Sequence, residues 1–245
     1  MALPQLNTPT YELLLPSTDL KVQYRPFLVK EEKLLLLALE SENDKEIIQA
    51  VKQVIENCTF GKLNAEELPI FDIEYIFLQI RAKSVGEVVK FKILCPDDKK
   101  TYADVELDLT AVDVQVEDEH NNNVVLDENK KLGIVFKYPT IKLFRRNLTN
   151  TNENIDTLLE IIYSCVDYIY EGENIYYGKD STTQELKDFV ENLSQKQFQS
   201  VQKFFESMPK LKHDINILNP KTNVESKIQL VGLQDFFEYA SLITH

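Results

Sequence analysis

The sequence has few of the residues from which most reactive sites are built. It contains six glycines, three cysteines and three histidines among 245 residues. Loops that wrap phosphate groups need closely spaced glycines, and no Gly-x-Gly-x-x-Gly, P-loop, Gly-x-Ser-x-Gly or His-Glu-x-x-His pattern is present. The sequence therefore gives no indication of a phosphate-binding loop, a serine hydrolase or a helical zinc protease.

The cysteines and histidines lack the spacing of a disulfide framework or a metal site. The cysteines are odd in number and unevenly spaced, which favours a reducing cytoplasm: Cys58, Cys95 and Cys165. The histidines do not share one helix turn or short loop: His120, His213 and His245. Cys95 opens a Cys-x-x-Asp turn where a zinc knuckle needs Cys-x-x-Cys. We expect no metal, no cofactor and no catalytic residue.

Positive charge and long apolar runs are also scarce. The 27 basic and 40 acidic residues give a net charge of −13, which repels phosphate backbones and argues against nucleic-acid binding. No run approaches the roughly 20 apolar residues that span a bilayer, and MALPQLNTPT has no signal-peptide pattern. We expect a soluble protein that does not bind membranes. The hydrophobic content of 43% is enough for a sizeable core.

The stretch 10–41 is the most strongly patterned part of the chain. Apolar-rich runs at 11–15 and 20–24 flank the turn formers Pro-Ser-Thr-Asp and predict a β-hairpin. A helix is predicted from Val29 onward. Its leucines, at positions 34–37 and 39, are apolar on more than one face, so we expect the helix to be buried between the hairpin and later helices.

The remaining periodicity predicts an α+β protein, with helical layers flanking antiparallel β-hairpins. Helices are predicted after Asn43 and at 70–83, 140–148, 155–170, 182–193 and 195–208, with a terminal helix after Gly232. Strands are predicted at 88–94, 102–109, 112–116, 124–126 and 132–138, forming one central antiparallel sheet of about five strands. In chain order these elements form segments 1–84, 85–139 and 140–245, expected to make one compact unit.

The strands at 88–94 and 102–109 form a predicted hairpin, and a later hairpin, at 214–218 and 226–231, resembles it. Residues 91–107 and 215–230 align with Pro96 and Pro220 at the same place. The likeness is that of two hairpin modules of similar pattern, either as an internal repeat or by chance, since any hairpin alternates apolar residues and has a turn.

The candidate partner-binding residues are surface features. Tyr176 and Tyr177 lie in a polar segment, 172–180, that reads as a loop or short strand, and aromatic side chains concentrate binding energy. The pairs Phe204-Phe205 and Phe236-Phe237 are more typical of core packing. Arg145 and Arg146 either grip an acidic partner or form a solvated helix face. The proline-bearing arm 1–9 is expected to pack on a neighbour or on its own body.

Four stretches carry a resemblance to a known family. They are MALPQLNTPTYELLLPSTDLKVQYRPFLVKEEKLLLLALES (1–41), RAKSVGEVVKFKILCP (81–96), FFESMPKLKHDINILNPKT (204–222) and GLQDFFEY (232–239). The chain resembles the T4-type phage baseplate hub subunits and hub assembly proteins. Members of that family often carry Cys-x-x-Cys knuckles at two hairpin tips, and this sequence departs from the knuckle at Asp98, Asn219 and Thr222.

The resemblance implies a structural or assembly role in a contractile-tail baseplate hub, by protein–protein binding and without enzymatic activity. The implied partners are other phage baseplate hub proteins, and the implied location is the virion tail baseplate or the host cytoplasm during assembly. Both a permanent virion component and an assembly chaperone that leaves before maturation fit. The alternative is an enzyme with a dispersed carboxylate-based hydrolase site, although the sequence pairs no carboxylates for it. Nothing in the sequence indicates a small-molecule substrate.

Overall fold

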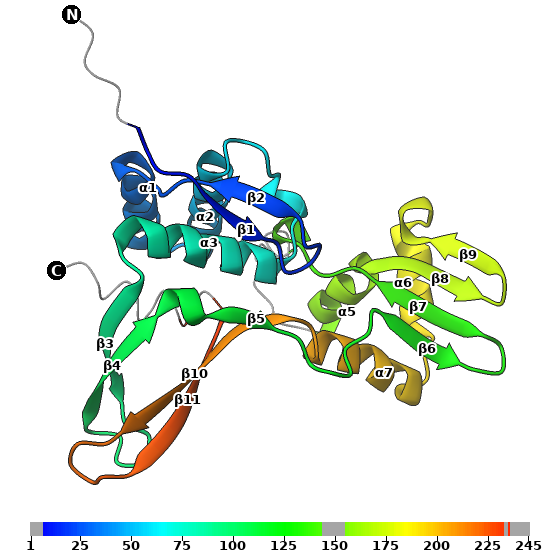
Figure 1. The fold of residues 1–245 in the computed structure, drawn as a ribbon. Helices are drawn as coiled ribbons and strands as arrows, with labels where there is room; N and C mark the ends of the chain where they lie inside the picture. Colours follow the sequence, from blue (N-terminus) through cyan, green and yellow to red (C-terminus); the bar gives the residue numbers. More distant parts are fainter. Residues whose placement is uncertain (1–6, 144–154, 233–234, 236–245) are drawn as a thin grey trace, which may run out of the picture. The chain divides into compact units, whose positions relative to one another are not determined.

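The computed structural model describes residues 7–143, 155–232 and 235. Helices alternate with small antiparallel sheets (Figure 1), so the predicted α+β class is confirmed. The chain folds as two compact units. Unit 1 comprises Met1–Ala65, Phe71–Gln115 and Lys210–His245, and unit 2 comprises Glu66–Ile70 and Val116–Pro209. The sequence segments 1–84, 85–139 and 140–245 follow chain order, whereas unit 1 joins residues from both ends of the chain.

Unit 1 begins with the predicted N-terminal hairpin. Strands β1 (Tyr11–Leu14) and β2 (Lys21–Tyr24) pair antiparallel, with Tyr11 opposite Tyr24. The tip of the hairpin is held on helix α3 (Ile70–Val85), because the buried Asp72 carboxylate accepts hydrogen bonds from the backbone N–H (3.1 Å) and the hydroxyl of Ser17. Burial raises the pKa of Asp72. The hairpin is therefore fixed at its tip.

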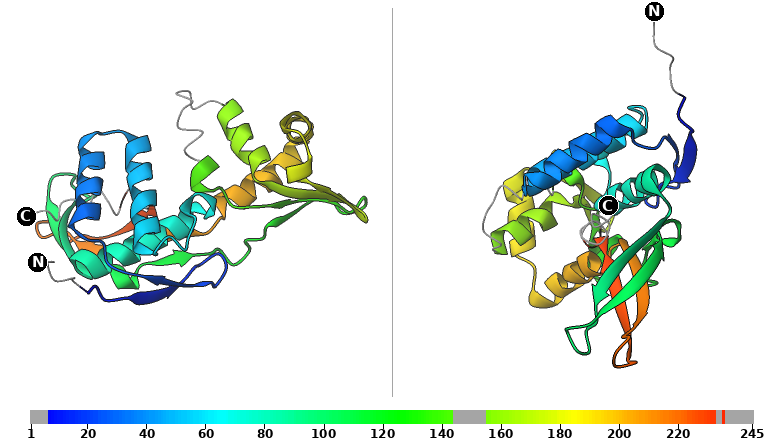
Figure 2. Two further views of the ribbon diagram at one scale, coloured as in Figure 1. Left: turned by 90° about the horizontal axis from the view of Figure 1, so that it is seen from above. Right: turned by 90° about the vertical axis from the view of Figure 1, so that its left-hand side faces the viewer.

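Helices α1 (Val29–Glu40) and α2 (Asp44–Cys58) follow as an antiparallel pair that projects away from α3 (Figure 2, left). The Asn43 side chain caps α2 by accepting from Lys45 N–H, as its sequence position predicts. The prediction that α1 is buried is wrong: its only buried residues are Glu31 and Ala38, and Leu36 and Leu37 are exposed. A projecting two-helix hairpin covers one side of each helix, so a helix that is apolar on more than one face keeps exposed apolar residues.

The rest of unit 1 is formed by two hairpins and a short strand. Strand β3 (Val88–Leu94) pairs with β4 (Tyr102–Asp108), while β10 (Lys210–Leu218) pairs with both β11 (Glu225–Val231) and β5 (Asp113–Gln115). One-turn helices lie at Ala65–Glu67 and Leu109–Ala111. Alternate strand residues meet Leu78 and Ala82 of α3 in one hydrophobic core, which includes Phe91, Val105, Ile215 and Leu230.

Unit 2 contains a four-stranded antiparallel sheet in the order β6 (Asn123–Asp127), β7 (Leu132–Phe136), β8 (Val166–Glu171) and β9 (Asn174–Tyr177). Helices α5 (Ile155–Ser164), α6 (Thr183–Glu191) and α7 (Gln195–Glu206) lie on one face of this sheet (Figure 2, left). Capping boxes start α6 at Thr182 and α7 at Ser194. A one-turn helix, Gly178–Asp180, links β9 to α6.

Two predictions fail in this region. The single central sheet is wrong, because β3 and β4 form a sheet of their own, β5 joins β10, and β6 and β7 join β8 and β9. The predicted helix 155–170 ends at Ser164, and Val166 begins strand β8. Val166 and Ile169 fit a helical repeat, but Val-Asp-Tyr-Ile-Tyr is rich in β-branched and aromatic residues and finds a paired strand on each side.

Some predicted elements lie partly outside the described residues. Of the predicted helix 140–148, residues 141–143 are helical, Thr140 forms an isolated β-bridge with Pro69, and residues 144–148 lie outside. The terminal helix, including Phe236 and Phe237, also lies outside, apart from Asp235. In the part of the chain that is described, no helix combines the length and hydrophobicity needed to cross a bilayer.

Candidate assembly surfaces

The sheet of unit 2 has one covered face and one bare face. The row Val124, Ile134 and Ile169 runs across β6, β7 and β8 and is buried against the helices, together with Leu186, Val201 and Phe204. The neighbouring rows point to the other face because side chains alternate along each strand. No described helix lies on that second face (Figure 2, left).

The bare face carries tyrosine and aliphatic side chains where a solvated sheet carries charge. Two rows across all four strands form this surface, here named the tyrosine face: Val125, Gly133, Tyr170 and Ile175, and Asn123, Val135, Tyr168 and Tyr177. Val125 is 49% exposed, Ile175 51% and Tyr177 45%. None of these eight residues is charged and most are aliphatic or aromatic, so the tyrosine face is largely apolar and partly exposed.

The tyrosines of this face are held by specific contacts. The rings of Tyr168 and Tyr177 meet edge to face, with centroids 6.0 Å apart. The Tyr170 hydroxyl donates to Asn123 Oδ1 at 2.9 Å, and its ring lies over Gly133, where a Cβ would come within 2.3 Å of the hydroxyl oxygen. Glycine at position 133 thus lets Tyr170 lie flat against the sheet. Rigid aromatic side chains present contact area at little entropic cost.

The outer face of the hairpin β3–β4 gives an internal comparison. Its exposed positions include the ion pairs Lys90–Glu106 (3.0 Å) and Lys92–Asp104 (3.8 Å). These pairs lie directly opposite each other in register and suit water. The tyrosine face has no such pairs within its two rows, which distinguishes it from a sheet face built for solvent.

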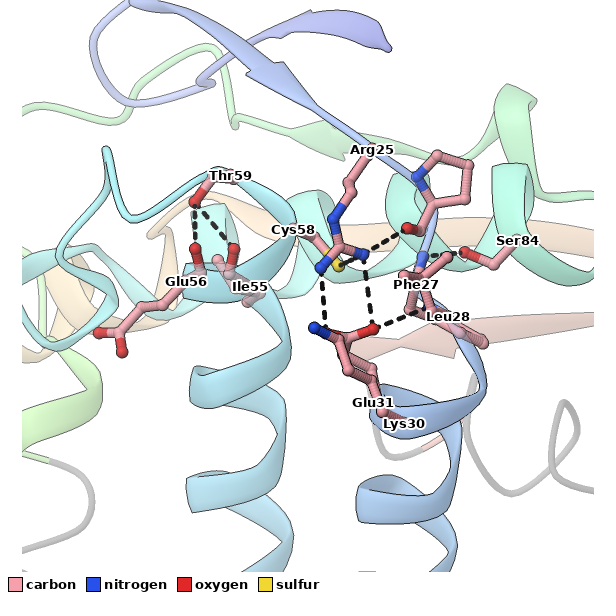
Figure 3. Close-up of polar contacts among 11 residues, drawn as sticks. Arg25, Phe27, Leu28, Lys30, Glu31, Ile55, Glu56, Cys58, Thr59 and Ser84 are labelled. Carbon is pink, nitrogen blue, oxygen red and sulfur yellow. Dashed lines mark hydrogen bonds and ion pairs between the residues drawn. The ribbon is translucent and has the colours of Figure 1, made fainter. Parts of the chain in front are cut away.

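A second exposed apolar surface is on α1, whose start is fixed by a buried ion pair (Figure 3). Arg25 Nη2 lies 3.0 Å from Glu31 Oε1, and the backbone N–H of Leu28 donates to Glu31 Oε2 at 2.9 Å. The same guanidinium donates to the carbonyl of Pro26 (2.8 Å) and lies 3.7 Å from Cys58 Sγ. This cluster joins the end of β2 to the start of α1 and the end of α2.

The buried Glu31 carboxylate keeps its charge, whereas the buried Cys58 thiol stays neutral. Burial acts to raise the pKa of Glu31, but hydrogen bonds from Arg25 and the Leu28 N–H outweigh it and hold that pKa below its ordinary value. Burial raises the pKa of the Cys58 thiol to about 11, so the thiol is neutral. The ion pair therefore stays charged and sets the direction in which α1 leaves the hairpin.

The tips of the two similar hairpins in unit 1 are joined by hydrogen bonds. Asp97 accepts from Asn219 Nδ2 (2.9 and 3.1 Å) and from the Thr222 hydroxyl (2.5 Å). These bonds lower the pKa of Asp97. Each tip turns through a residue with positive φ, Lys99 at 52° and Asn223 at 58°, so the likeness extends to backbone geometry.

The tips of these two hairpins are also where similar sequences often carry a zinc knuckle, so they are a candidate metal site. Cys95 and Asn219 are both buried at equivalent positions, while Asp98 accepts hydrogen bonds from Thr101 within its own loop, which lower its pKa. Among the described residues, no group of three or more histidine, cysteine or acidic side chains could hold a metal ion. The three cysteines are buried and free.

His120, from the polar segment before β6, is part of a hydrogen-bonded network in unit 2. Its Nδ1 lies 2.9 Å from the hydroxyl of Ser207, which ends α7, and its Nε2 lies 2.9 Å from the Tyr138 hydroxyl. Tyr138 in turn donates to Asn122 Oδ1 at 3.0 Å. Burial lowers the pKa of His120. With both ring nitrogens engaged and its ring stacked on Phe204 (5.3 Å), His120 is a structural side chain.

The structure places the predicted partner-binding residues as follows. Tyr176 and Tyr177 are on edge strand β9, and both are exposed. They point to opposite faces, and only Tyr177 belongs to the tyrosine face. Phe204 is buried and Phe205 partly buried, as expected of core residues. Arg145, Arg146 and residues 1–6 of the arm lie outside the described residues.

Sequence reasoning missed most of the tyrosine face. Tyr168 and Tyr170 were assigned to a helix, which hid their alignment with Tyr177 and Ile175. The β-branched and aromatic content of Val-Asp-Tyr-Ile-Tyr at 166–170 was the available signal. The exposed side of α1 was missed because the run of leucines suggested burial on all sides.

Comparison with known proteins gives one match. The family model described as T4 bacteriophage base plate protein matches residues 8–238. No curated protein and no solved structure matches. The matched range includes both hairpin tips, α1 and the whole tyrosine face. The chain therefore belongs to the family of T4 bacteriophage base plate proteins.

Proposed function

We propose that this baseplate protein is a structural or assembly component of the hub of a contractile phage tail, and that it binds other hub proteins through the tyrosine face. Family membership supports a structural role in the baseplate over a catalytic one. The proposal rests mainly on the uncharged, partly exposed tyrosine face of a sheet whose other face packs against α5, α6 and α7. Exposed apolar patches of this kind mark protein-binding sites.

The proposal assigns distinct tasks to the parts of unit 2. The helices α5, α6 and α7 and the buried row of the sheet make a rigid support. Tyr168, Tyr170 and Tyr177 supply flat contact area, and Lys179, whose Nζ lies 5.4 Å from the Tyr177 ring centroid, borders it. Interfaces gain most of their affinity from a few such aromatic residues. A partner that covers this face removes the apolar side chains from water.

A triple variant tests the proposal. Val125→Ser, Ile175→Ser and Tyr177→Ser together change three exposed side chains of the tyrosine face. We expect a thermal melt close to that of the wild type, at least a tenfold loss of co-purification with hub proteins from infected cells, and fewer complete baseplates, since loss of interface aromatics typically costs about 2 kcal/mol or more each.

A matched control is available on the β3–β4 hairpin. Val88→Ser, Leu94→Ser and Tyr102→Ser change side chains of similar kind and exposure on a face that also carries ion pairs. This variant is expected to assemble normally. Normal assembly of the tyrosine-face variant would refute the proposed binding surface.

The chain is proposed to act either in the virion or in the host cytoplasm during assembly. Mass spectrometry of purified virions beside infected-cell lysate separates these two forms of the proposal. A stoichiometric amount in virions identifies a permanent hub component, whereas presence only in lysate identifies an assembly chaperone.

A further inference from the structure

Four exposed residues form a stripe along α1. Lys33, Leu36, Leu37 and Glu40 follow the spacing i, i+3, i+4 and i+7, which places them on one side of a helix. All four are exposed, with Leu36 at 43% and Leu37 at 53%. Val29, 79% exposed, extends the same side toward the N-terminus. We name Lys33, Leu36, Leu37 and Glu40 the α1 stripe.

The α1 stripe lies on the side opposite the packed side of the helix. The two buried residues of α1 are Glu31 and Ala38. At about 100° per residue, Ala38 lies roughly 150° and Glu31 roughly 170° around the helix axis from the centre of the stripe. The stripe therefore faces away from the packed side of α1, in agreement with the exposure of its four residues.

The charges at the ends of the stripe are arranged symmetrically. Lys33 stands three residues before Leu36, and Glu40 stands three residues after Leu37. Among the described residues, neither Lys33 nor Glu40 forms an ion pair. An antiparallel copy of the same stripe, related by a two-fold axis between Leu36 and Leu37, brings Lys33 beside Glu40 of the second copy, twice. The stripe is thus complementary to itself in charge.

We infer that the occupant of the α1 stripe is a second copy of this chain, bound through antiparallel packing of α1 on α1. The four leucines at the two-fold axis are buried between the helices, as in a short antiparallel coiled coil, and the two Lys33–Glu40 pairs fix the register. The buried Arg25–Glu31 pair anchors α1 at its start, so the stripe is presented on a preorganised helix.

This inference is independent of the proposed function. The α1 stripe is in unit 1 and the tyrosine face is in unit 2, so one surface can be disabled without the other. The interface spans only about two to three helix turns, so the dimer is expected to be weak and to dissociate on dilution.

Charge exchange on the full-length chain tests the inference. Sedimentation velocity at physiological salt measures the mass across a wide range of protein concentration, from the 28.4 kDa monomer upward. Lys33→Glu or Glu40→Lys alone sets like charges opposite each other twice, and each is expected to weaken dimerisation at least tenfold. The double variant Lys33→Glu/Glu40→Lys restores opposite charges and is expected to dimerise within about threefold of the wild type.

The control exchange is Lys187→Glu/Glu191→Lys on α6, an exposed ion pair at i, i+4. It and its single variants should leave dimerisation unchanged. Monomeric wild type at every concentration, or a double variant no better than the single ones, overturns the inference. A wild-type monomer whose melting temperature falls in Leu36→Ser/Leu37→Ser also overturns it, because the stripe is then covered by the chain's own residues.

Discussion

Leu36 and Ala38 lie two positions apart on α1, yet Leu36 is 43% exposed and Ala38 is 6% exposed. One faces water and the other faces α2, since a helix turns by about 200° over two residues. Burial on this helix therefore depends on position and not on the hydrophobicity of the side chain.

Aspartate substitutions at these two positions should give opposite results. Ala38→Asp places an unpaired carboxylate in the helix pair and is expected to destabilise the protein by several kcal/mol. Leu36→Asp on the exposed side is expected to change the free energy of unfolding by about 0.5 kcal/mol or less in dilute, monomeric protein. Chemical denaturation of both variants checks this. Equal, large losses would mean that the α1 stripe is covered.

The buried Arg25–Glu31 pair should make a large contribution when broken from one side. Glu31→Gln leaves the Arg25 guanidinium buried without its countercharge and is expected to cost about 3–5 kcal/mol. Lys30→Gln is the control, because Lys30 also lies near Glu31 Oε1 (3.5 Å) but is exposed to water. Urea unfolding of the two variants measures the difference. A small loss in Glu31→Gln would contradict the role of this pair in fixing α1.

The hairpin tips should hold together without zinc. Because Asp97 joins them by hydrogen bonds to Asn219 and Thr222, a chelator is expected to leave the thermal melt unchanged, and elemental analysis should find no stoichiometric zinc. Asn219→Ala removes a buried hydrogen-bonding side chain and should cost about 1–3 kcal/mol, whereas exposed Lys221→Ala should cost little. One zinc per chain that is lost in Cys95→Ser would contradict this description.

Stability should fall on mild acidification through His120. Its pKa is lowered by burial from the ordinary value of 6.5, so just below pH 6.5 the unfolded chain binds more protons than the folded protein. The contribution of His120 is complete above pH 6.5 and is lost as the pH falls toward the folded-state pKa. His120→Gln should therefore show a flatter dependence of the free energy of unfolding on pH between 7 and 5, measured by denaturant titration. Identical slopes would show that His120 carries no such coupling.

Local signals in the sequence predicted the elements well. Turn formers, capping residues and alternation located both similar hairpins, the N-terminal hairpin and the starts of α2, α6 and α7. Pairing between strands could not be predicted in the same way. The alternating residues 112–116 continue the pattern of the preceding strand, which suggested the same sheet. Their strand β5 instead pairs with β10, about a hundred residues later, and nothing local indicates that partner.

The candidate surfaces could be predicted only in part. Tyr177 was identified from its type and position, whereas Tyr168 and Tyr170 depended on recognising β8, where valine and isoleucine at 166 and 169 satisfy a helical period equally well. The exposed leucines of α1 could not be predicted, because composition does not reveal that two helices project from the core.

The central claim is that the tyrosine face is a binding surface of the assembled hub. Hydroxyl-radical footprinting with mass spectrometry tests it most directly, by comparing tyrosine modification in the free protein and in hub complexes isolated from infected cells. Tyr177, 45% exposed, should become protected together with Tyr168 and Tyr170, while Tyr102, 58% exposed on the outer face of β4, should remain reactive and serve as the internal control. Unchanged modification of Tyr177 in those complexes would contradict the account.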